Sequence, residues 1–106
     1  MKVVITGKNG LLSSQLQIID TNITALDSVN YNVIDKSIIQ KLNNMNPDII
    51  IHAAAVTNSA IIKNNPLSAI QTNIIGTANI AEYCLINNKR LIYISTDYIY
   101  PGKKGN

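Results

Sequence analysis

Short apolar runs alternate along the chain with segments in which apolar residues recur every three or four positions. The runs have strand length and are rich in β-branched residues, which is typical of strands that are buried on both faces. They cover residues 3–7, 23–26, 48–55 and 90–95. The spacing in between is typical of helices. These predicted helices cover residues 11–20, 35–46 and 65–88.

This order predicts an α/β fold, a parallel Rossmann-type sheet with flanking helices and right-handed crossovers. We expect four strands of an incomplete doubly wound domain, because the pattern dissolves into loop after Thr96. The fourth strand is then an exposed edge that a partner protein could cover.

The helices carry local signals of their ends and of their buried faces. Asp35 is a candidate N-cap, Pro66 suits a first turn, and Gly76 indicates close packing. For residues 11–20 the spacing predicts a buried face of Leu11, Leu12, Gln15, Leu16 and Ile19. For residues 65–88 it predicts one of Ala69, Ile70, Asn73, Ile74, Thr77, Ile80, Ala81 and Cys84.

Composition narrows the class of protein. The net charge is +3, but only 14% of residues are charged and no basic run exceeds a pair, so a nucleic-acid surface is not predicted. Cys84 is the only cysteine, which excludes an internal disulfide and favours a reducing compartment. No apolar run reaches the ~20 residues of a membrane span. We therefore expect a cytoplasmic protein without a membrane or nucleic-acid partner.

Two glycines lie between the first strand and the first helix, in the stretch TGKNGLLS. Gly7 permits a tight turn, and Gly10 lets the backbone approach a pyrophosphate at the helix N-terminus. Ser13 occupies the position of a third glycine, where its side chain could crowd the helix against the strand. A purely structural turn is the alternative interpretation.

Acidic and basic residues near this turn bear on the choice of cofactor. Asp27 ends the second predicted strand, where a carboxylate would accept hydrogen bonds from the adenosine ribose and favour NADH. Ser28 and Lys8 could instead tolerate the 2′-phosphate of NADPH. A solvated aspartate in a turn explains Asp27 equally well.

The ends of the third and fourth predicted strands carry small and polar residues. Ala53, Ala54 and Ala55 leave room for a flat ligand, and Ser95 and Thr96 place hydroxyls where open α/β sheets bind ligands. His52 lies inside an apolar strand, so we predict a hydrogen-bonded core histidine. No cluster has metal-ligand spacing, and no metal site is predicted.

Together these motifs resemble extended short-chain dehydrogenases/reductases, and more narrowly the dTDP-4-dehydrorhamnose reductase family. The stretches that carry the resemblance are MKVVITGKNGLLSSQL, ALDSVNYNVID, NPDIIIHAAAVTN, NPLSAIQTNIIGTANIAEYC and LIYISTDYIYPGKKGN. They run in family order over nearly the whole chain. YPG stands where the family more usually has an aromatic residue, Asp and Gly.

The resemblance implies roles for individual residues. Those implied to hold NADPH or NADH are Gly7, Lys8, Asn9, Gly10, Leu11, Leu12, Asp35, Ala53, Ala54 and Ala55. Thr96 is implied to be the hydroxyl member of the catalytic triad, with Asp97 near the sugar and Asn73 near the active site. Residues 1–106 would then be a partial NAD(P)-binding domain, without the C-terminal part that binds a nucleotide sugar.

Tyr100 and Lys104 have the Tyr-x-x-x-Lys spacing of the family's catalytic pair. Pro101 and Gly102 separate them and oppose a helix, and the pair follows Thr96 too closely. We interpret the pair as a coincidence and expect the chain alone to be inactive.

The resemblance thus implies the N-terminal portion of an NAD(P)H-dependent reductase of a nucleotide-linked 4-keto-deoxysugar. One alternative is a non-catalytic binding subunit, like the regulatory subunit of methionine adenosyltransferase. Others are a fragment of a sugar-nucleotide epimerase or dehydratase, and a gene remnant without function.

Overall fold

Strands and helices alternate along the described chain in the order that the sequence predicts. The computed structural model describes residues 1–53 and 63–94. Its elements are β1 (Val3–Thr6), α1 (Leu11–Ile19), β2 (Thr24–Leu26), α2 (Ser37–Met45), β3 (Ile49–His52), α4 (Pro66–Asn87) and β4 (Arg90–Tyr93). Each element lies within its predicted segment.

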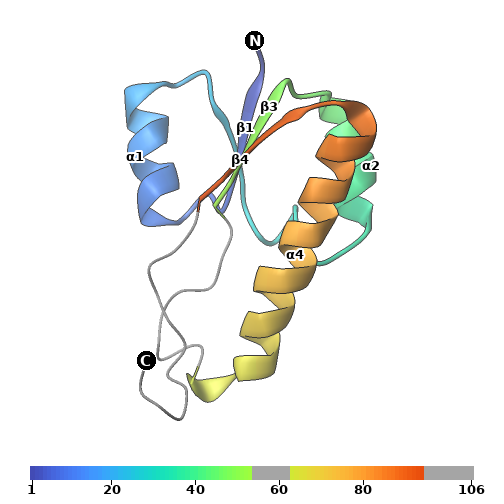
Figure 1. The fold of residues 1–106 in the computed structure, drawn as a ribbon. Helices are drawn as coiled ribbons and strands as arrows, with labels where there is room; N and C mark the ends of the chain where they lie inside the picture. The colour runs from blue at the N-terminus through green and yellow to red at the C-terminus, as the bar shows by residue number, and fades with distance from the viewer. Residues whose placement is uncertain (54–62, 95–106) are drawn as a thin grey trace.

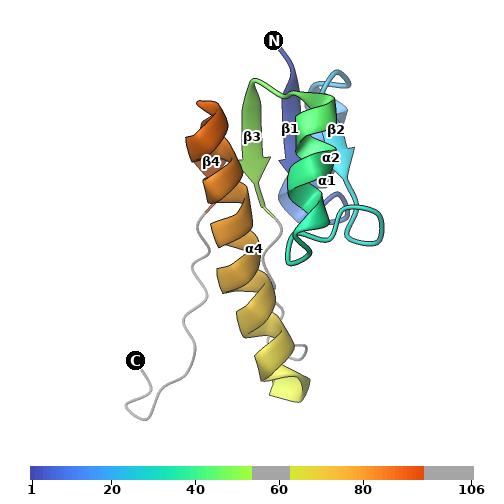
Figure 2. The same cartoon turned by 90° about the vertical axis from the view of Figure 1, so that its right-hand side faces the viewer.

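The four strands form one parallel sheet in the order β2-β1-β3-β4. Figure 2 shows β3, β1 and β2 side by side, with β4 behind α4. Ile5 of β1 pairs with Ala25 of β2 on one side and with Ile51 of β3 on the other. The chain therefore moves from β1 to β2 and then crosses back to the opposite side of β1. Such a reversal is a topological switch point, where open α/β sheets bind ligands beyond the carboxyl ends of their strands. The predicted parallel α/β fold is confirmed.

Helices cover the two faces of this sheet unequally. α1 lies on one face, and α2 and α4 lie side by side on the other (Figures 1 and 2). The main apolar cluster fills the layer between the sheet and α2 and α4, where burial removes apolar area from water. It consists of Val4, Leu26, Val33, Ile38, Leu42, Ile50, Ile80, Tyr83 and Cys84.

Asparagines mark both ends of α4. At its start, the side chain of Asn65 accepts a hydrogen bond from the Ser68 amide, and Pro66 occupies the first turn. At its end, Asn88 has a left-handed backbone with φ 55°, and its amide bonds to the Cys84 carbonyl. Both arrangements satisfy backbone groups that a helix end leaves unpaired.

The predicted buried face of α4 is partly wrong. Ala69, Ile80 and Cys84 are buried as predicted, but Ile70 is 44% and Ile74 is 64% exposed. The N-terminal half of α4 projects past the carboxyl ends of the strands (Figure 1), so apolar residues there have no described layer to pack on.

Polar and small residues complete the buried face of α4 instead. The Asn79 side chain donates to the Val33 carbonyl at 2.8 Å, and the Tyr83 hydroxyl donates to the Leu42 carbonyl at 3.2 Å. At Gly76 an added Cβ would lie 2.4 Å from Val33 Cγ2, so the close packing predicted there is confirmed. Hydrophobic spacing alone could not identify these contacts, because they use side-chain shape and hydrogen bonds.

The predicted buried face of α1 is also wrong. Leu11 and Ile19 are each 78% exposed, and Ser13 is the residue of α1 that is buried. The helix approaches the sheet through this small side chain, and Leu16 and Gln17, about one turn further on, are half-buried. A short hydroxyl residue therefore sets the inward face.

β4 is an edge of the sheet in the described part of the chain. It pairs with β3, and Ile92 and Tyr93 are 43% and 49% exposed. The predicted exposed edge is confirmed there, while its coverage by a partner remains a prediction. No helix within residues 1–53 and 63–94 is long and apolar enough to cross a membrane.

Candidate dinucleotide site

The glycine turn lies between β1 and α1, at the carboxyl edge of the sheet. Gly7 has φ 76°, which is a left-handed conformation that favours glycine. The Gly10 amide donates to the Gly7 carbonyl at 3.0 Å, and a Cβ on Gly10 would lie 3.3 Å from that oxygen. The turn is therefore tight, and glycine is needed at Gly7 for its backbone angle.

The start of α1 is open to an anion. Gly10 is its N-cap and offers no side-chain hydrogen bond, and the first turn carries no acidic residue. The first amides of a helix lack intrahelical partners and attract negative charge. Leu11 and Leu12 are 78% and 37% exposed at this point, so the turn is accessible.

Ser13 fits against the strand without the crowding that its extra atoms suggested. It is fully buried, and its hydroxyl donates to the Thr6 carbonyl at 3.2 Å. The serine thus ties α1 to the end of β1 through a side-chain bond, an interaction that a glycine at this position would lack.

Asp27 follows β2, close to the glycine turn, since the Lys8 amide bonds to the Leu26 carbonyl at 3.1 Å. Its Oδ1 accepts from the amides of Val29 and Asn30 at 3.0 and 2.8 Å. Hydrogen bonds from the Asn30 backbone and side chain hold the pKa of Asp27 below its usual value. The carboxylate organises its own turn, as one of the two interpretations expected.

Asp35 lies one residue before the N-cap position. α2 begins at Ser37 with Lys36 as N-cap, so the predicted N-cap is off by one residue. Asp35 nevertheless accepts the Ser37 amide at 2.9 Å, and this bond lowers the pKa of its exposed carboxyl. It thus replaces part of a cap through an aspartate turn.

A buried polar network lies under the switch point. Thr6 Oγ1 is 2.9 Å from His52 Nδ1, and His52 Nε2 is 3.0 Å from Thr77 Oγ1. The His52 ring also stacks on Tyr93, with ring centroids 5.9 Å apart. Burial lowers the pKa of His52 to about 4, so the ring is neutral at physiological pH. The prediction of a hydrogen-bonded core histidine is confirmed, but no sequence signal pointed to its two threonine partners.

The remaining predicted site residues divide between described and undescribed parts of the chain. Ala53 follows β3 and is half-buried, and Asn73 is half-buried on α4, where it has a further interaction. Lys8 and Asn9 are exposed in the glycine turn. The predictions for Ala54, Ala55, Ser95, Thr96, Asp97, Tyr100 and Lys104 fall outside the described residues.

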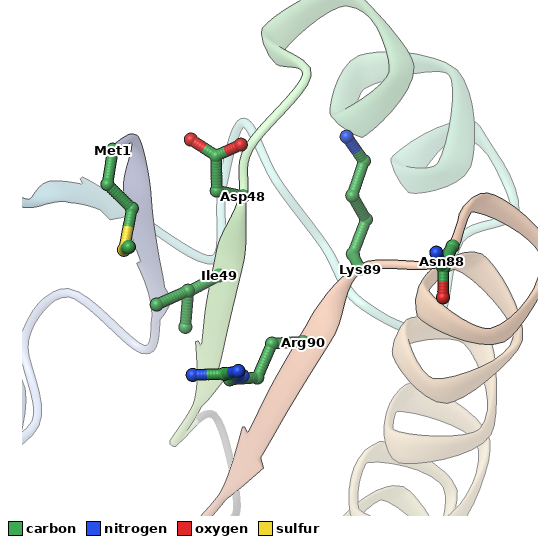
Figure 3. Close-up of a pocket in the computed structure, with 6 residues that line it drawn as sticks. All are labelled: Met1, Asp48, Ile49, Asn88, Lys89 and Arg90. Atoms are coloured by element: carbon green, nitrogen blue, oxygen red, sulfur yellow. The ribbon is translucent and has the colours of Figure 1, made fainter.

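The described surface has hollows outside the glycine turn, and one of them is lined by Asn30, Tyr31, Lys41, Asn44 and Met45. Another hollow, of about 410 Å³, lies at the amino ends of β1, β3 and β4 (Figure 3). The glycine turn follows the carboxyl end of β1, so it belongs to the opposite edge of the sheet. In this second hollow the Asp48 carboxylate accepts the Lys2 amide, and the Lys89 ammonium bonds to Asn46, so these groups serve the ends of strands and helices. Within the described residues, no three His, Cys, Asp or Glu side chains gather as metal ligands do.

A four-stranded parallel sheet with helices on both faces and a glycine turn at its switch point defines an α/β protein of Rossmann type. Comparison with known proteins narrows this class. The chain belongs to the family described as the RmlD substrate binding domain, which matches residues 1–106.

Named relatives agree with this assignment. The chain is 28% identical over 109 residues to dTDP-4-dehydrorhamnose reductase of Aggregatibacter actinomycetemcomitans, covering 97% of this chain and 37% of the relative. The solved dTDP-4-dehydrorhamnose reductase of Bacillus anthracis in complex with NADP superposes with a TM-score of 0.82 and 34% identity, covering 95% of this chain and 38% of that one. Methionine adenosyltransferase 2 subunit beta of Pongo abelii is 31% identical over 72 residues, covering 67% of this chain and 22% of its own length. The chain thus spans little more than a third of the reductases that it matches.

Proposed function

We propose that this chain is the N-terminal, cofactor-binding portion of an NAD(P)H-dependent reductase that acts on a nucleotide-linked 4-keto-deoxysugar. The glycine turn at the switch point is the observation that carries this proposal. It combines the left-handed backbone of Gly7 with an open helix start, and the two lie beside the carboxyl end of β3. The similar Bacillus anthracis reductase was solved in complex with NADP, which supports the same ligand class.

Different residues of the chain are assigned to different parts of the dinucleotide. The turn of Gly7, Lys8, Asn9 and Gly10 approaches the pyrophosphate, and the first amides of α1 donate to it. Asp27 and Asp35 lie toward the adenosine half. The Asp27 Oδ2 atom, whose described partner is Asn30 Nδ2 at 3.3 Å, keeps a lone pair for a ribose hydroxyl.

Lys8 and Ser28 flank the end of β2 with exposed side chains, which suits the 2′-phosphate of NADPH. Ala53, together with Ala54 and Ala55, lines the path of the cofactor. The bound cofactor supplies the hydride, and the protein holds the ketone beside it and provides a proton.

Thr96 is the hydroxyl that we assign to the reacting carbonyl, with Ser95, Asp97 and Asn73 near the sugar. The tyrosine and lysine that complete this machinery in the family would come from residues beyond this chain. We therefore expect residues 1–106 alone to bind dinucleotide without turning over the ketone. Oxidation of NADPH by the purified chain, dependent on a nucleotide-linked 4-keto-deoxysugar, would contradict this.

Equilibrium titration with NADPH, NADP⁺ and NADH tests the binding site directly. Gly7→Ala should weaken binding by about tenfold or more, because alanine is strained at positive φ and the turn would relax away from the phosphates. Ile18→Ala is the matched control, because Ile18 is exposed at the far end of α1, the helix that follows the glycine turn. This variant should bind like wild type. Circular dichroism checks that both variants are folded. Equal affinity of Gly7→Ala and Ile18→Ala would count against the glycine turn.

A second candidate is a non-catalytic binding subunit, which the similarity to methionine adenosyltransferase 2 subunit beta favours. Assays of the complete protein separate the two candidates. A reductase oxidises NADPH when given the keto sugar. A binding subunit would retain dinucleotide affinity, show no turnover, and form a stable stoichiometric complex with another protein.

A further inference from the structure

Thr6 is the residue on which the candidate site converges. It ends β1 and directly precedes Gly7, and it is 1% exposed. Its carbonyl accepts the Ser13 hydroxyl from α1, and its own hydroxyl accepts the Ala53 amide at 2.9 Å. One buried threonine therefore touches the glycine turn, the first helix and the backbone that leaves β3.

The bond to Ala53 lies beyond the last strand pairing between β1 and β3. That register ends with Ile5 opposite Ile51. Beyond this pair, the Ala53 amide, which follows β3, donates to the Thr6 hydroxyl and not to a carbonyl of β1. The distance between the glycine turn and the Ala53 backbone therefore depends on how the Thr6 side chain is oriented.

His52 controls that orientation. It is 1% exposed, and its two ring nitrogens contact Thr6 Oγ1 and Thr77 Oγ1 at 2.9 and 3.0 Å. Tyr93 stacks on the ring and restricts its rotation. A neutral imidazole has one donor and one acceptor nitrogen, so Nδ1 can accept a hydrogen bond from the Thr6 hydroxyl while Nε2 donates to Thr77.

We propose that Thr6 and His52 are positioning residues of the dinucleotide site: His52, anchored on α4 through Thr77, orients the Thr6 hydroxyl, which holds the Ala53 backbone at a fixed distance from the glycine turn. This inference rests on the proposed function, because the groove that it sets is the one assigned to NAD(P)H. Neither residue touches the ligand in this role. Both act through Gly7 and Ala53.

Two substitutions of the same residue test the role of His52. His52→Asn keeps an amide group where Nδ1 faces Thr6, whereas His52→Gln places its amide near Nε2, toward Thr77. Both variants remove the ring and its stacking on Tyr93, so both should lose comparable stability. A difference in NADPH affinity between them therefore reports on the bond to Thr6 and not on general packing.

We expect His52→Asn to bind NADPH about tenfold more tightly than His52→Gln in equilibrium titrations of the full chain, which corresponds to roughly one buried hydrogen bond. Thr6→Val, which keeps the shape but loses the hydroxyl, should bind about tenfold more weakly than wild type. Urea unfolding of each variant gives the accompanying change in stability.

The outcomes separate the two levels of the proposal. A wild-type chain that binds no dinucleotide overturns the proposed function and the positioning role together. If wild type binds NADPH while His52→Asn and His52→Gln have equal affinity, only the positioning role is overturned. A Thr6→Val variant that binds NADPH as tightly as wild type would also overturn the positioning role alone. If Thr6→Val does not fold, the pair of His52 variants still decides.

Discussion

The two faces of the sheet are built differently, although a helix of nine residues lies on each. On one face α2 buries Ile38 and Leu42 completely against the sheet. On the other face α1, of equal length, buries Ser13 and leaves Ile18 80% exposed. Stability is therefore concentrated on the α2 and α4 face, while the α1 face carries the glycine turn.

This difference between the two faces agrees with the ligand-binding role proposed for the glycine turn. A ligand-binding turn must remain accessible and must adjust to its ligand, and such segments come from the less stable parts of a fold. The Ser13 and Thr6 contacts connect the two faces, because Thr6 also bonds to His52, which in turn bonds to Thr77 of α4. The glycine turn is thus connected through Thr6 and His52 to the well-packed layer of α2 and α4.

Matched isoleucines give the largest expected effect and the most direct test of this comparison. Ile38→Ala should lower the free energy of unfolding by about 2–5 kcal/mol, because it removes a fully buried side chain and leaves a cavity. Ile18→Ala, in the helix on the other face, should change it by less than about 0.5 kcal/mol. Urea unfolding of the two variants measures both values. Similar losses would mean that α1 is packed as firmly as α2.

A second prediction uses the buried histidine under α4. Burial lowers the pKa of His52 to about 4, below the unfolded value of 6.5, so the folded state favours the neutral ring. Its contribution to stability is complete above about pH 6.5 and is lost as pH falls toward 4, because only the unfolded chain takes up a proton in that window. The loss should approach about 1.4 kcal/mol per pH unit.

His52 is the only histidine in the chain, so His52→Asn is a suitable control. Its stability should be nearly constant between pH 6.5 and 5, since Asp27 and Asp35 have lowered pKa values and respond at more acidic pH. Denaturant midpoints measured at half-unit intervals would show the difference. Parallel pH profiles for wild type and His52→Asn would be inconsistent with a buried neutral histidine.

A third prediction concerns the contact between α4 and the loop before α2. Gly76→Ala should destabilise by about 1–2 kcal/mol, because its Cβ would overlap Val33 Cγ2 at 2.4 Å. The higher helix propensity of alanine, worth about 1 kcal/mol, offsets part of this cost. The double variant Gly76→Ala with Val33→Ala removes the overlapping methyl groups. Thermal unfolding should show less than additive loss in it, and strict additivity would refute the overlap.

The sequence predicted the elements, their order and the parallel sheet, because long periodic segments and β-branched runs report burial directly. It also located the glycine turn and the core histidine. It predicted close packing at Gly76 but not that Val33 is the partner. It also missed the bonds from Asn79 and Tyr83 to backbone carbonyls, which depend on three-dimensional shape. Thr6 escaped notice since a threonine in a strand is ordinary, and only the pairing of β1 with β3 brings it to Ala53 and His52.

The smallest expected effect concerns Ser13, the inward residue of α1. If the serine crowded the helix, Ser13→Gly would stabilise the protein. The bond from Ser13 Oγ to the Thr6 carbonyl predicts the opposite, a loss of about 1 kcal/mol from the missing hydrogen bond and the poorer helix propensity of glycine. Ser13→Ala should lose less, about 0.5 kcal/mol, because alanine favours the helix. Urea unfolding should therefore rank wild type above Ser13→Ala and Ser13→Ala above Ser13→Gly. The reverse order would show that α1 is held away from the sheet by its serine.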